Sequence, residues 1–344
     1  MSSNPDHDRA VQHWLTVCLF LVFAMIILGG ATRLTGSGLS MVNWHPTGTL
    51  PPLTLAQWQA EFELYQQYPE YQLLNQDMTL DGFKSIFWFE YAHRMLGRLI
   101  GLVFLLPLLY FWFRKMIRPG MLPRLIVMFF LGGFQGLLGW YMVKSGLVNN
   151  PAVSQYRLTA HLLSALVIYA FIFWTLLDVA INRPYQKLRD SSVTRWRFMS
   201  IGLLTLLLVT IVSGGFVAGL KAGQIFNTFP LMGGRLVPEG IGALSPWYMN
   251  AFENMVAVQF NHRWLAISIG VLLVIWYWKG RTCFNEPQLQ KSFKWIGMMV
   301  IIQLILGIST LLTQVPVVLG VLHQAGALLL LTALVFNIYQ LSRR

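Results

Sequence analysis

The sequence predicts an all-α integral membrane protein whose eight transmembrane helices form two tandem four-helix bundles, with both termini in the cytoplasm. Three observations predict this fold class: an apolar composition, eight apolar runs of membrane-spanning length, and an internal duplication. Hydrophobic residues make up 56% of the 344 residues and charged residues 11%, and the mean hydropathy is +0.56. A chain of this composition cannot cover a water-soluble globule with polar side chains.

The apolar runs are each near the roughly 20 residues that a helix needs to cross a bilayer. The first run lacks a small-residue cleavage site, so we expect it to remain as a helix rather than to be removed as a signal peptide. An even number of spans places both termini on one side. The runs cover residues 12–33, 90–113, 122–143, 157–178, 197–219, 257–278, 293–313 and 317–341.

The distribution of Lys and Arg predicts the orientation, because cytoplasmic loops accumulate these residues. The long first loop is acidic and therefore faces outward, with Trp44, Trp58 and Trp88 as candidate interfacial anchors. The net charge of +12 is then a topology signal and gives no reason to expect a nucleic-acid partner. The basic residues that we expect on the cytoplasmic side are Arg114, Lys115, Arg118, Arg124, Arg183, Lys187, Arg189, Arg195, Arg197, Lys279, Arg281, Lys291, Lys294, Arg343 and Arg344.

The second half of the chain repeats features of the first. Gly29-Gly30 recurs as Gly214-Gly215, and His93-Arg94 recurs as His262-Arg263. Because each copy has an even number of spans, the copies share an orientation and are related by a pseudo-two-fold axis along the membrane normal. We therefore expect an N-terminal bundle at 1–180, a cytoplasmic linker at 181–195 and a C-terminal bundle at 196–344.

Four histidines lie within about one turn of the predicted outer ends of four helices. They are His93, His161, His262 and His323, and small residues follow each after one turn, at Gly97, Ala165, Ala266 and Ala327. A single intramembrane histidine is ordinarily a hydrogen-bonded core residue, but repetition in register favours two pairs of axial haem ligands. His7, His13 and His45 have no repeat partner, and we expect no such role for them.

The two halves differ at one position close to these histidines. Glu90 precedes His93 by one turn, whereas Gln259 stands before His262. A carboxylate on the histidine face can accept a proton or stabilise a cation, so one reactive and one passive redox site are expected; the alternative is a carboxylate that ends its helix at the interface. Candidate contacts to haem propionates, with snorkelling to the headgroups as the alternative, are Arg94, Arg98, Arg157 and Arg263.

Several segments resemble the haem A synthase family, and the resemblance covers nearly the whole chain. The matching segments are Gly29 to Ser40, Glu90-Tyr91-Ala92-His93-Arg94, Val153 to Arg157 leading to His161, Phe252-Glu253-Asn254, and Gln259-Phe260-Asn261-His262-Arg263. Because the first outer loop has no cysteine pair, the chain is similar to the cysteine-free branch typical of proteobacteria and mitochondria, in which no loop disulfide relays electrons.

The resemblance implies an eight-helix enzyme that oxidises the C8 methyl of haem O to a formyl group, through successive hydroxylations and loss of water, to give haem A for terminal oxidases. It also implies that His262 and His323 hold a resident haem b. His93 and His161 would bracket the substrate haem, with Glu90 as the catalytic carboxylate. We expect a bacterial inner membrane with the haem sites toward the periplasm.

The implied partners are membrane lipid, haem O, the haem O synthase that supplies it, an unidentified electron donor or acceptor, and a second copy of the chain. Two other functional classes would account for part of this sequence pattern. A di-haem membrane cytochrome that only transfers electrons, for example to quinone, needs the same histidines but gives no reason for the Glu90 difference. A transporter built from two repeats would carry its polar groups near the midplane rather than at the outer edge.

Overall fold

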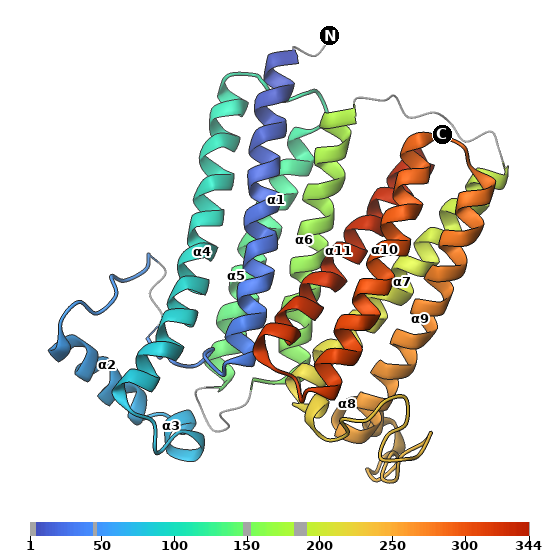
Figure 1. The fold of residues 1–344 in the computed structure, drawn as a ribbon. Coiled ribbons are helices and arrows are strands. Elements are labelled where there is room, and N and C mark those ends of the chain that lie inside the picture. Colours follow the sequence, from blue (N-terminus) through green and yellow to red (C-terminus); the bar gives the residue numbers. More distant parts are fainter. Residues whose placement is uncertain (1–4, 44–46, 147–152, 182–190, 344) are drawn as a thin grey trace. The chain divides into compact units, whose positions relative to one another are not determined.

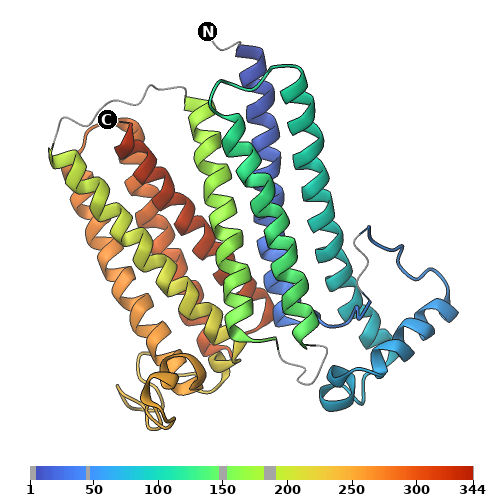
Figure 2. The ribbon, with the colours of Figure 1, turned by 180° about the vertical axis from the view of Figure 1, so that it is seen from behind.

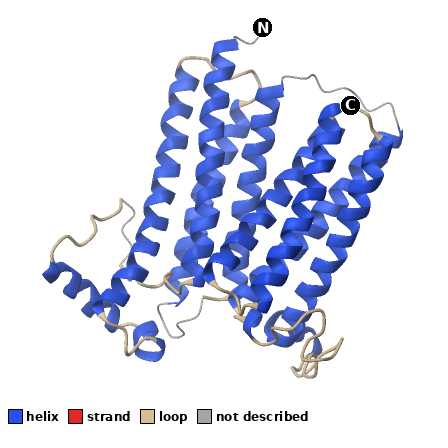
Figure 3. Cartoon of the chain, viewed as in Figure 1, coloured by secondary structure: helices blue, strands red, loops and turns tan. Residues whose placement is uncertain are grey.

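The computed structural model describes residues 5–43, 47–146, 153–181 and 191–343, and within these ranges the chain is helical without a β-strand (Figure 3). Eight of the described helices are long and apolar enough to cross a membrane, which confirms the expected number of spans. They are α1 (Pro5–Leu34), α4 (Leu80–Phe113), α5 (Leu122–Gly146), α6 (Gln155–Ile181), α7 (Ser191–Gly219), α9 (Met255–Cys283), α10 (Pro287–Leu312) and α11 (Val317–Ser342) (Figure 1).

The chain divides into two compact units, Met1–Ile172 and Phe173–Arg344, and the division falls inside α6. The last turns of α6 belong to the second unit because the Trp174 ring lies 5.2 Å from that of Tyr339 and Asp178 pairs with Arg343. Most of the linker expected at 181–195 lies outside the described residues, as do Arg183, Lys187, Arg189 and Arg344. Residues 191–195 form the start of α7.

In the first unit, α1 packs along α4, and α4 packs against α5. Trp14 of α1 donates its indole N–H to the carbonyl oxygen of Val103 at 2.8 Å, and its ring lies 5.1 Å from the ring of Phe104. At the N-terminal end of α1, Asp8 forms an ion pair with Arg118 at 2.6 Å. This pair ties α1 to the basic connection between α4 and α5.

The connection between α1 and α4, called the first outer loop because the charge pattern predicts that it faces outward, contains two helices that the hydrophobic pattern did not predict. They are α2 (Leu55–Gln66) and α3 (Pro69–Leu74). Thr54 and Gln57 form a reciprocal capping box at the start of α2, and Pro69 begins α3, where its missing N–H costs nothing. Trp58 is buried against Phe83 and Phe87 of α4, so the expectation that it anchors at the membrane interface is wrong. Trp88 is 46% exposed, and Trp44 lies outside the described residues.

In the second unit, α7, α9, α10 and α11 form a closed ring in which each helix packs against two neighbours (Figure 2). Asn337 of α11 is fully buried, accepts a hydrogen bond from Ser200 and donates one to Ser292, both at 2.8 Å. The connection between α7 and α9 contains three short helices: η1 (Ala222–Gln224), η2 (Trp247–Met249) and α8 (Asn250–Glu253).

Candidate functional site

The four repeated histidines come from four different helices: His93 from α4, His161 from α6, His262 from α9 and His323 from α11. His93 and His161 lie in the first compact unit, and His262 and His323 lie in the second. Each pair that the sequence predicted thus falls within one unit. All four side chains keep some exposed surface.

Each histidine ring packs against a glycine of a neighbouring helix. A Cβ added to Gly307 would lie 2.8 Å from the Cε1 atom of His323, and one added to Gly139 would lie 3.1 Å from Cε1 of His161. The corresponding distances are 3.0 Å from Gly214 to Cε1 of His262 and 3.3 Å from Gly29 to Nε2 of His93. Any larger residue would push the ring away, so the glycines set where the imidazoles lie.

A glutamine side chain holds one histidine of each pair. The amide nitrogen of Gln135 on α5 lies 3.2 Å from Nδ1 of His161, and that of Gln303 on α10 lies 3.1 Å from Nδ1 of His323. Each amide also donates to the backbone carbonyl of its histidine, at 2.9 Å and 3.0 Å respectively. The Ser164 hydroxyl also donates to the side-chain oxygen of Gln135. The corresponding residue in the second unit is Gly326, which has no hydroxyl.

His262 has further polar contacts on α7. Its Nδ1 atom lies 2.9 Å from the hydroxyl of Ser213 and 3.2 Å from the backbone carbonyl oxygen of Thr210. The same Ser213 hydroxyl lies 2.7 Å from the Thr210 carbonyl. The ring is thus held on its Nδ1 edge by α7, next to Gly214.

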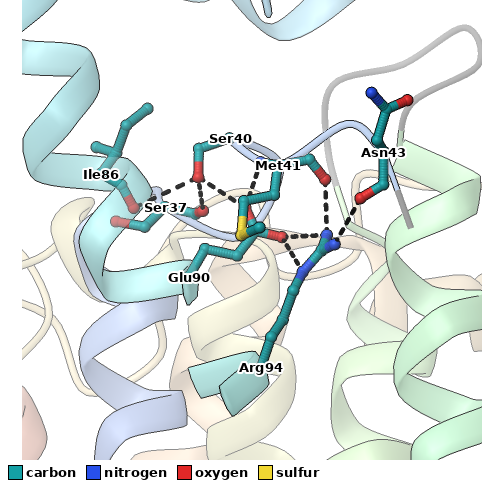
Figure 4. Close-up of polar contacts among 7 residues, drawn as sticks. All are labelled: Ser37, Ser40, Met41, Asn43, Ile86, Glu90 and Arg94. Atoms are coloured by element: carbon teal, nitrogen blue, oxygen red, sulfur yellow. Dashed lines mark hydrogen bonds and ion pairs between the residues drawn. The ribbon is translucent and has the colours of Figure 1, made fainter. Parts of the chain in front are cut away.

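Glu90 lies well inside α4, which begins at Leu80, so the alternative that it merely ends the helix is wrong. Its carboxylate is 2% exposed and accepts hydrogen bonds from the Ser40 hydroxyl at 2.7 Å and the Met41 backbone N–H at 2.8 Å (Figure 4). Arg94, one turn along α4, donates to the other carboxylate oxygen from Nε at 3.0 Å and from NH2 at 2.5 Å. Glu90 is therefore a buried carboxyl group whose two oxygens both have hydrogen-bond partners, one of them a guanidinium.

Arg94 also joins the first outer loop to α4. It donates to the carbonyl oxygens of Met41 at 2.7 Å and Asn43 at 3.0 Å, besides its bonds to Glu90 (Figure 4). This ion pair was not predicted from the sequence, although the i, i+4 spacing of Glu90 and Arg94 indicates it. The loop is thereby fixed over the helix that carries His93.

The second unit has a corresponding arrangement in which an amide replaces the carboxylate. Gln259 donates to the carbonyl oxygen of Phe226 at 3.0 Å, and Arg263 donates to that of Thr228 at 2.6 Å and also to that of Phe226. Among the described residues, the Gln259 side-chain oxygen and the Arg263 Nε have no hydrogen-bond partner. A loop is again held over the histidine-bearing helix, but by an amide in place of a carboxylate.

The remaining candidate residues lie near these sites. Arg98 lies beneath Gly48 of the first outer loop, where an added Cβ would be 3.3 Å from its Nε, and the Arg157 guanidinium stacks 4.6 Å from the centre of the Tyr141 ring. An added Cβ at Gly97 would meet only Met25, at 3.5 Å, so the glycines on neighbouring helices, not this one, contact the imidazoles. His7 and His13 lie at the start of α1, and His45 is outside the described residues.

Comparisons with known proteins find relatives that match nearly the whole chain. A family model described as COX15-CtaA, cytochrome oxidase assembly protein, matches residues 12–335. A protein named "Heme A synthase" from Nitrosospira multiformis is 48% identical over 350 residues, covering 100% of this chain and 98% of the relative. "Heme A synthase COX15" from Homo sapiens is 44% identical over 343 residues, covering 98% of this chain and 83% of the relative.

Proposed function

The chain belongs to the COX15-CtaA family of cytochrome oxidase assembly proteins, and from this premise we propose that it is a haem A synthase, which oxidises a methyl group of haem O to a formyl group. The observation that carries the proposal is a difference between the two units. Each unit has a pair of histidines packed against glycines, but only the first unit also has a buried carboxylate, Glu90, on a histidine-bearing helix. A protein with two identical electron-transfer sites would not need that difference.

The residues present fit haem. Each of the four imidazoles is backed by a glycine whose Cβ would displace the ring, so the flat rings have a defined position. His262 is held through Nδ1, which leaves Nε2 as the nitrogen to meet iron. We assign His262 and His323 to a resident haem b, and His93 and His161 to the substrate haem O.

A resident haem would supply one-electron transfer, and four electrons leave the carbon as a methyl becomes a formyl group. In the N-terminal unit, Glu90 supplies a fixed negative charge that would stabilise positive charge developing near the methyl group. Arg94 directs this carboxylate, because the guanidinium holds one oxygen while Ser40 and Met41 hold the other. Glu90 is the candidate catalytic residue, and Arg94 is a positioning residue.

The four arginines differ in what they offer to propionates. Arg94 and Arg263 already bind loop carbonyl oxygens, so we assign them to holding the outer loops, with any propionate contact made from the remaining N–H groups. Arg98 and Arg157 occur in the first unit, and their guanidinium groups contact the loop at Gly48 and the Tyr141 ring. These two are the better candidates for substrate propionates.

The setting follows from the same assignments. The chain spans a membrane with lipid around its helices, and the bacterial relatives favour the inner membrane with the haem sites on the periplasmic side. A haem O synthase would supply the substrate, and a separate redox partner would exchange electrons with the resident haem.

Expression with a source of haem O, followed by haem extraction and chromatography, tests the proposal. Formyl haem should appear with the unaltered chain and not with Glu90→Gln, while both retain haem b. If both chains bind haem b and neither converts haem O, the protein is instead an electron-transfer cytochrome. The matched control is Gln259→Glu, which places a carboxylate in the second unit and should not change the product.

A further inference from the structure

We propose that Ser213, acting with the backbone carbonyl of Thr210, is a positioning residue that fixes His262 as a permanent iron ligand, and that the lack of a counterpart at His93 makes the N-terminal site the one that exchanges its haem. This inference rests on the proposed function. It explains why one haem stays and the other leaves, although the four histidines are alike in sequence.

The contacts of Nδ1 determine which His262 nitrogen carries the proton. A carbonyl oxygen can only accept a hydrogen bond, so the 3.2 Å contact with the Thr210 oxygen requires that Nδ1 donates. The Ser213 hydroxyl hydrogen is directed to the same carbonyl, at 2.7 Å, and its oxygen therefore accepts from Nδ1 at 2.9 Å. Both contacts give the Nδ1–H tautomer, whose free lone pair is on Nε2.

A different edge of the His93 ring faces its neighbouring glycine. The glycine beside it faces Nε2, at 3.3 Å from an added Cβ, with Cδ2 next at 3.8 Å. At His262 the glycine instead faces Cε1, at 3.0 Å, with Nδ1 next at 3.5 Å. The edge of the His93 ring that faces Gly29 of α1 is therefore the Nε2–Cδ2 edge and not the Nδ1 edge.

The repeat explains this difference in terms of residues. Gly29 corresponds to Gly214, so Leu28 stands where Ser213 stands. Leu28 has no hydroxyl, and in the ranges that the structure describes neither ring nitrogen of His93 has a hydrogen-bond partner. The other member of each pair does not differ in this way, because Gln135 and Gln303 hold Nδ1 of His161 and His323 at 3.2 Å and 3.1 Å. His161 and His323 thus share an amide partner at Nδ1, although Ser164 bonds only the first of these glutamines, whereas His93 and His262 differ at Nδ1 itself.

A hydrogen bond from Nδ1–H makes Nε2 a stronger donor to iron, and loss of such a partner typically weakens metal affinity roughly 10–100-fold. Because the Thr210 carbonyl remains when Ser213 is shortened, we expect an effect near the lower limit for Ser213→Ala, about tenfold. A stronger donor nitrogen stabilises ferric iron more than ferrous iron. A tenfold loss confined to the ferric form raises the midpoint potential of the haem by about 59 mV.

The experiment uses the full chain purified from cells that lack haem O, so that haem b is the haem bound. Four proteins are compared: the unaltered chain, Ser213→Ala, Ser213→Thr, which keeps the hydroxyl, and Leu28→Ser, which adds one at the corresponding N-terminal position. The measurements are haem b per chain, the rate of haem transfer to excess apomyoglobin, the midpoint potential and the melting temperature.

Ser213→Ala should lose haem about tenfold faster and have the raised potential, with an unchanged melting temperature of the haem-free chain, and Ser213→Thr should restore both values. Leu28→Ser, supplied with haem O, should release it more slowly than the unaltered chain. Equal haem transfer rates and potentials for Ser213→Ala and the unaltered chain would overturn the inference while leaving the proposed function intact. An unaltered chain that binds no haem b would overturn the proposed function itself.

Discussion

Alanine at Gly307 is expected to weaken haem b binding without destabilising the polypeptide. The added Cβ would lie 2.8 Å from Cε1 of His323, whereas ordinary contacts between carbon atoms begin near ~3.5 Å. The ring cannot simply turn aside, because Gln303 holds both its Nδ1 atom and its backbone carbonyl. The imidazole must therefore move away from the position that the glycine allows.

Overpacking of this kind costs about 1–3 kcal/mol. Since 1.4 kcal/mol is a factor of ten in an equilibrium constant, the affinity for haem b should fall roughly 5–150-fold. An alanine in a helix interior is meanwhile more favourable than glycine by about 1 kcal/mol, so the haem-free chain should melt at the same temperature or higher. Weaker haem binding with undiminished stability is the expected signature.

The assay is titration of the haem-free chain with haem b, followed by absorbance, together with thermal melting. Gly133→Ala is the matched control, because nothing lies within 4 Å of a Cβ added there. Gly214→Ala, with its Cβ at 3.0 Å from His262, should give a smaller loss than Gly307→Ala. If Gly307→Ala binds haem b as tightly as Gly133→Ala, the contact between glycine and imidazole does not position the ligand.

Three further outcomes are expected. Glu90→Gln keeps the side-chain shape but leaves Arg94 without its charged partner, so haem A formation should be lost while haem O binding persists; full turnover by this variant would remove Glu90 from the catalytic role. Burial, and secondarily Glu70, raises the pKa of the Tyr65 phenol, so the folded state favours the neutral form, and the stabilisation is complete below about pH 10 and lost at higher pH. Melting temperatures measured between about pH 9 and 11 should therefore fall more steeply for the unaltered chain than for Tyr65→Phe, and parallel curves would contradict this. Asn337→Ala should lower the free energy of unfolding by about 1–2 kcal/mol with an unchanged haem spectrum, because Asn337 joins α7, α10 and α11 away from the histidines; a shifted spectrum would show coupling to the haem site.

The hydrophobic pattern was sufficient to predict the eight spans because a bilayer imposes one length and one composition on every helix that crosses it. It did not predict where α4 begins, since residues 80–89 extend the helix into the outer region and pack on α2 rather than on lipid. The signals for α2 and α3, the Thr54 capping box and Pro69, are readable in the sequence but specify helix starts, not hydrophobic spans. The family predicted from the motifs is confirmed by matches over the whole chain.

The sequence was sufficient to predict which residues form the candidate site, but not which residues they contact. Repetition identified the four histidines and the Glu90 difference, but their roles stay predictions. Sequence could not show that Gly29 contacts His93 or that Met41 and Asn43 bind Arg94, because these partners are far apart in the chain and only packing sets their register. Ser213 was not predicted, because the corresponding residue in the first half is Leu28. The repeat identifies residues that the two halves share, and this position differs between them.

Two differences between the units support the same assignment of roles, with oxidation in the first unit and a permanently bound haem in the second. The first unit has a buried ion pair, Glu90 with Arg94, where the second has the neutral Gln259, and the second unit has Ser213 where the first has Leu28. A charged group beside the first pair of histidines favours chemistry there, and an unrestrained His93 favours release of the product. In the second unit a firmly held His262, next to a neutral amide, favours a haem that remains bound and only changes its oxidation state. Exchanging residues at either position should therefore alter one property without the other. Leu28→Ser should slow haem release while leaving oxidation intact, and Glu90→Gln should stop oxidation while leaving the release rate of bound haem O unchanged.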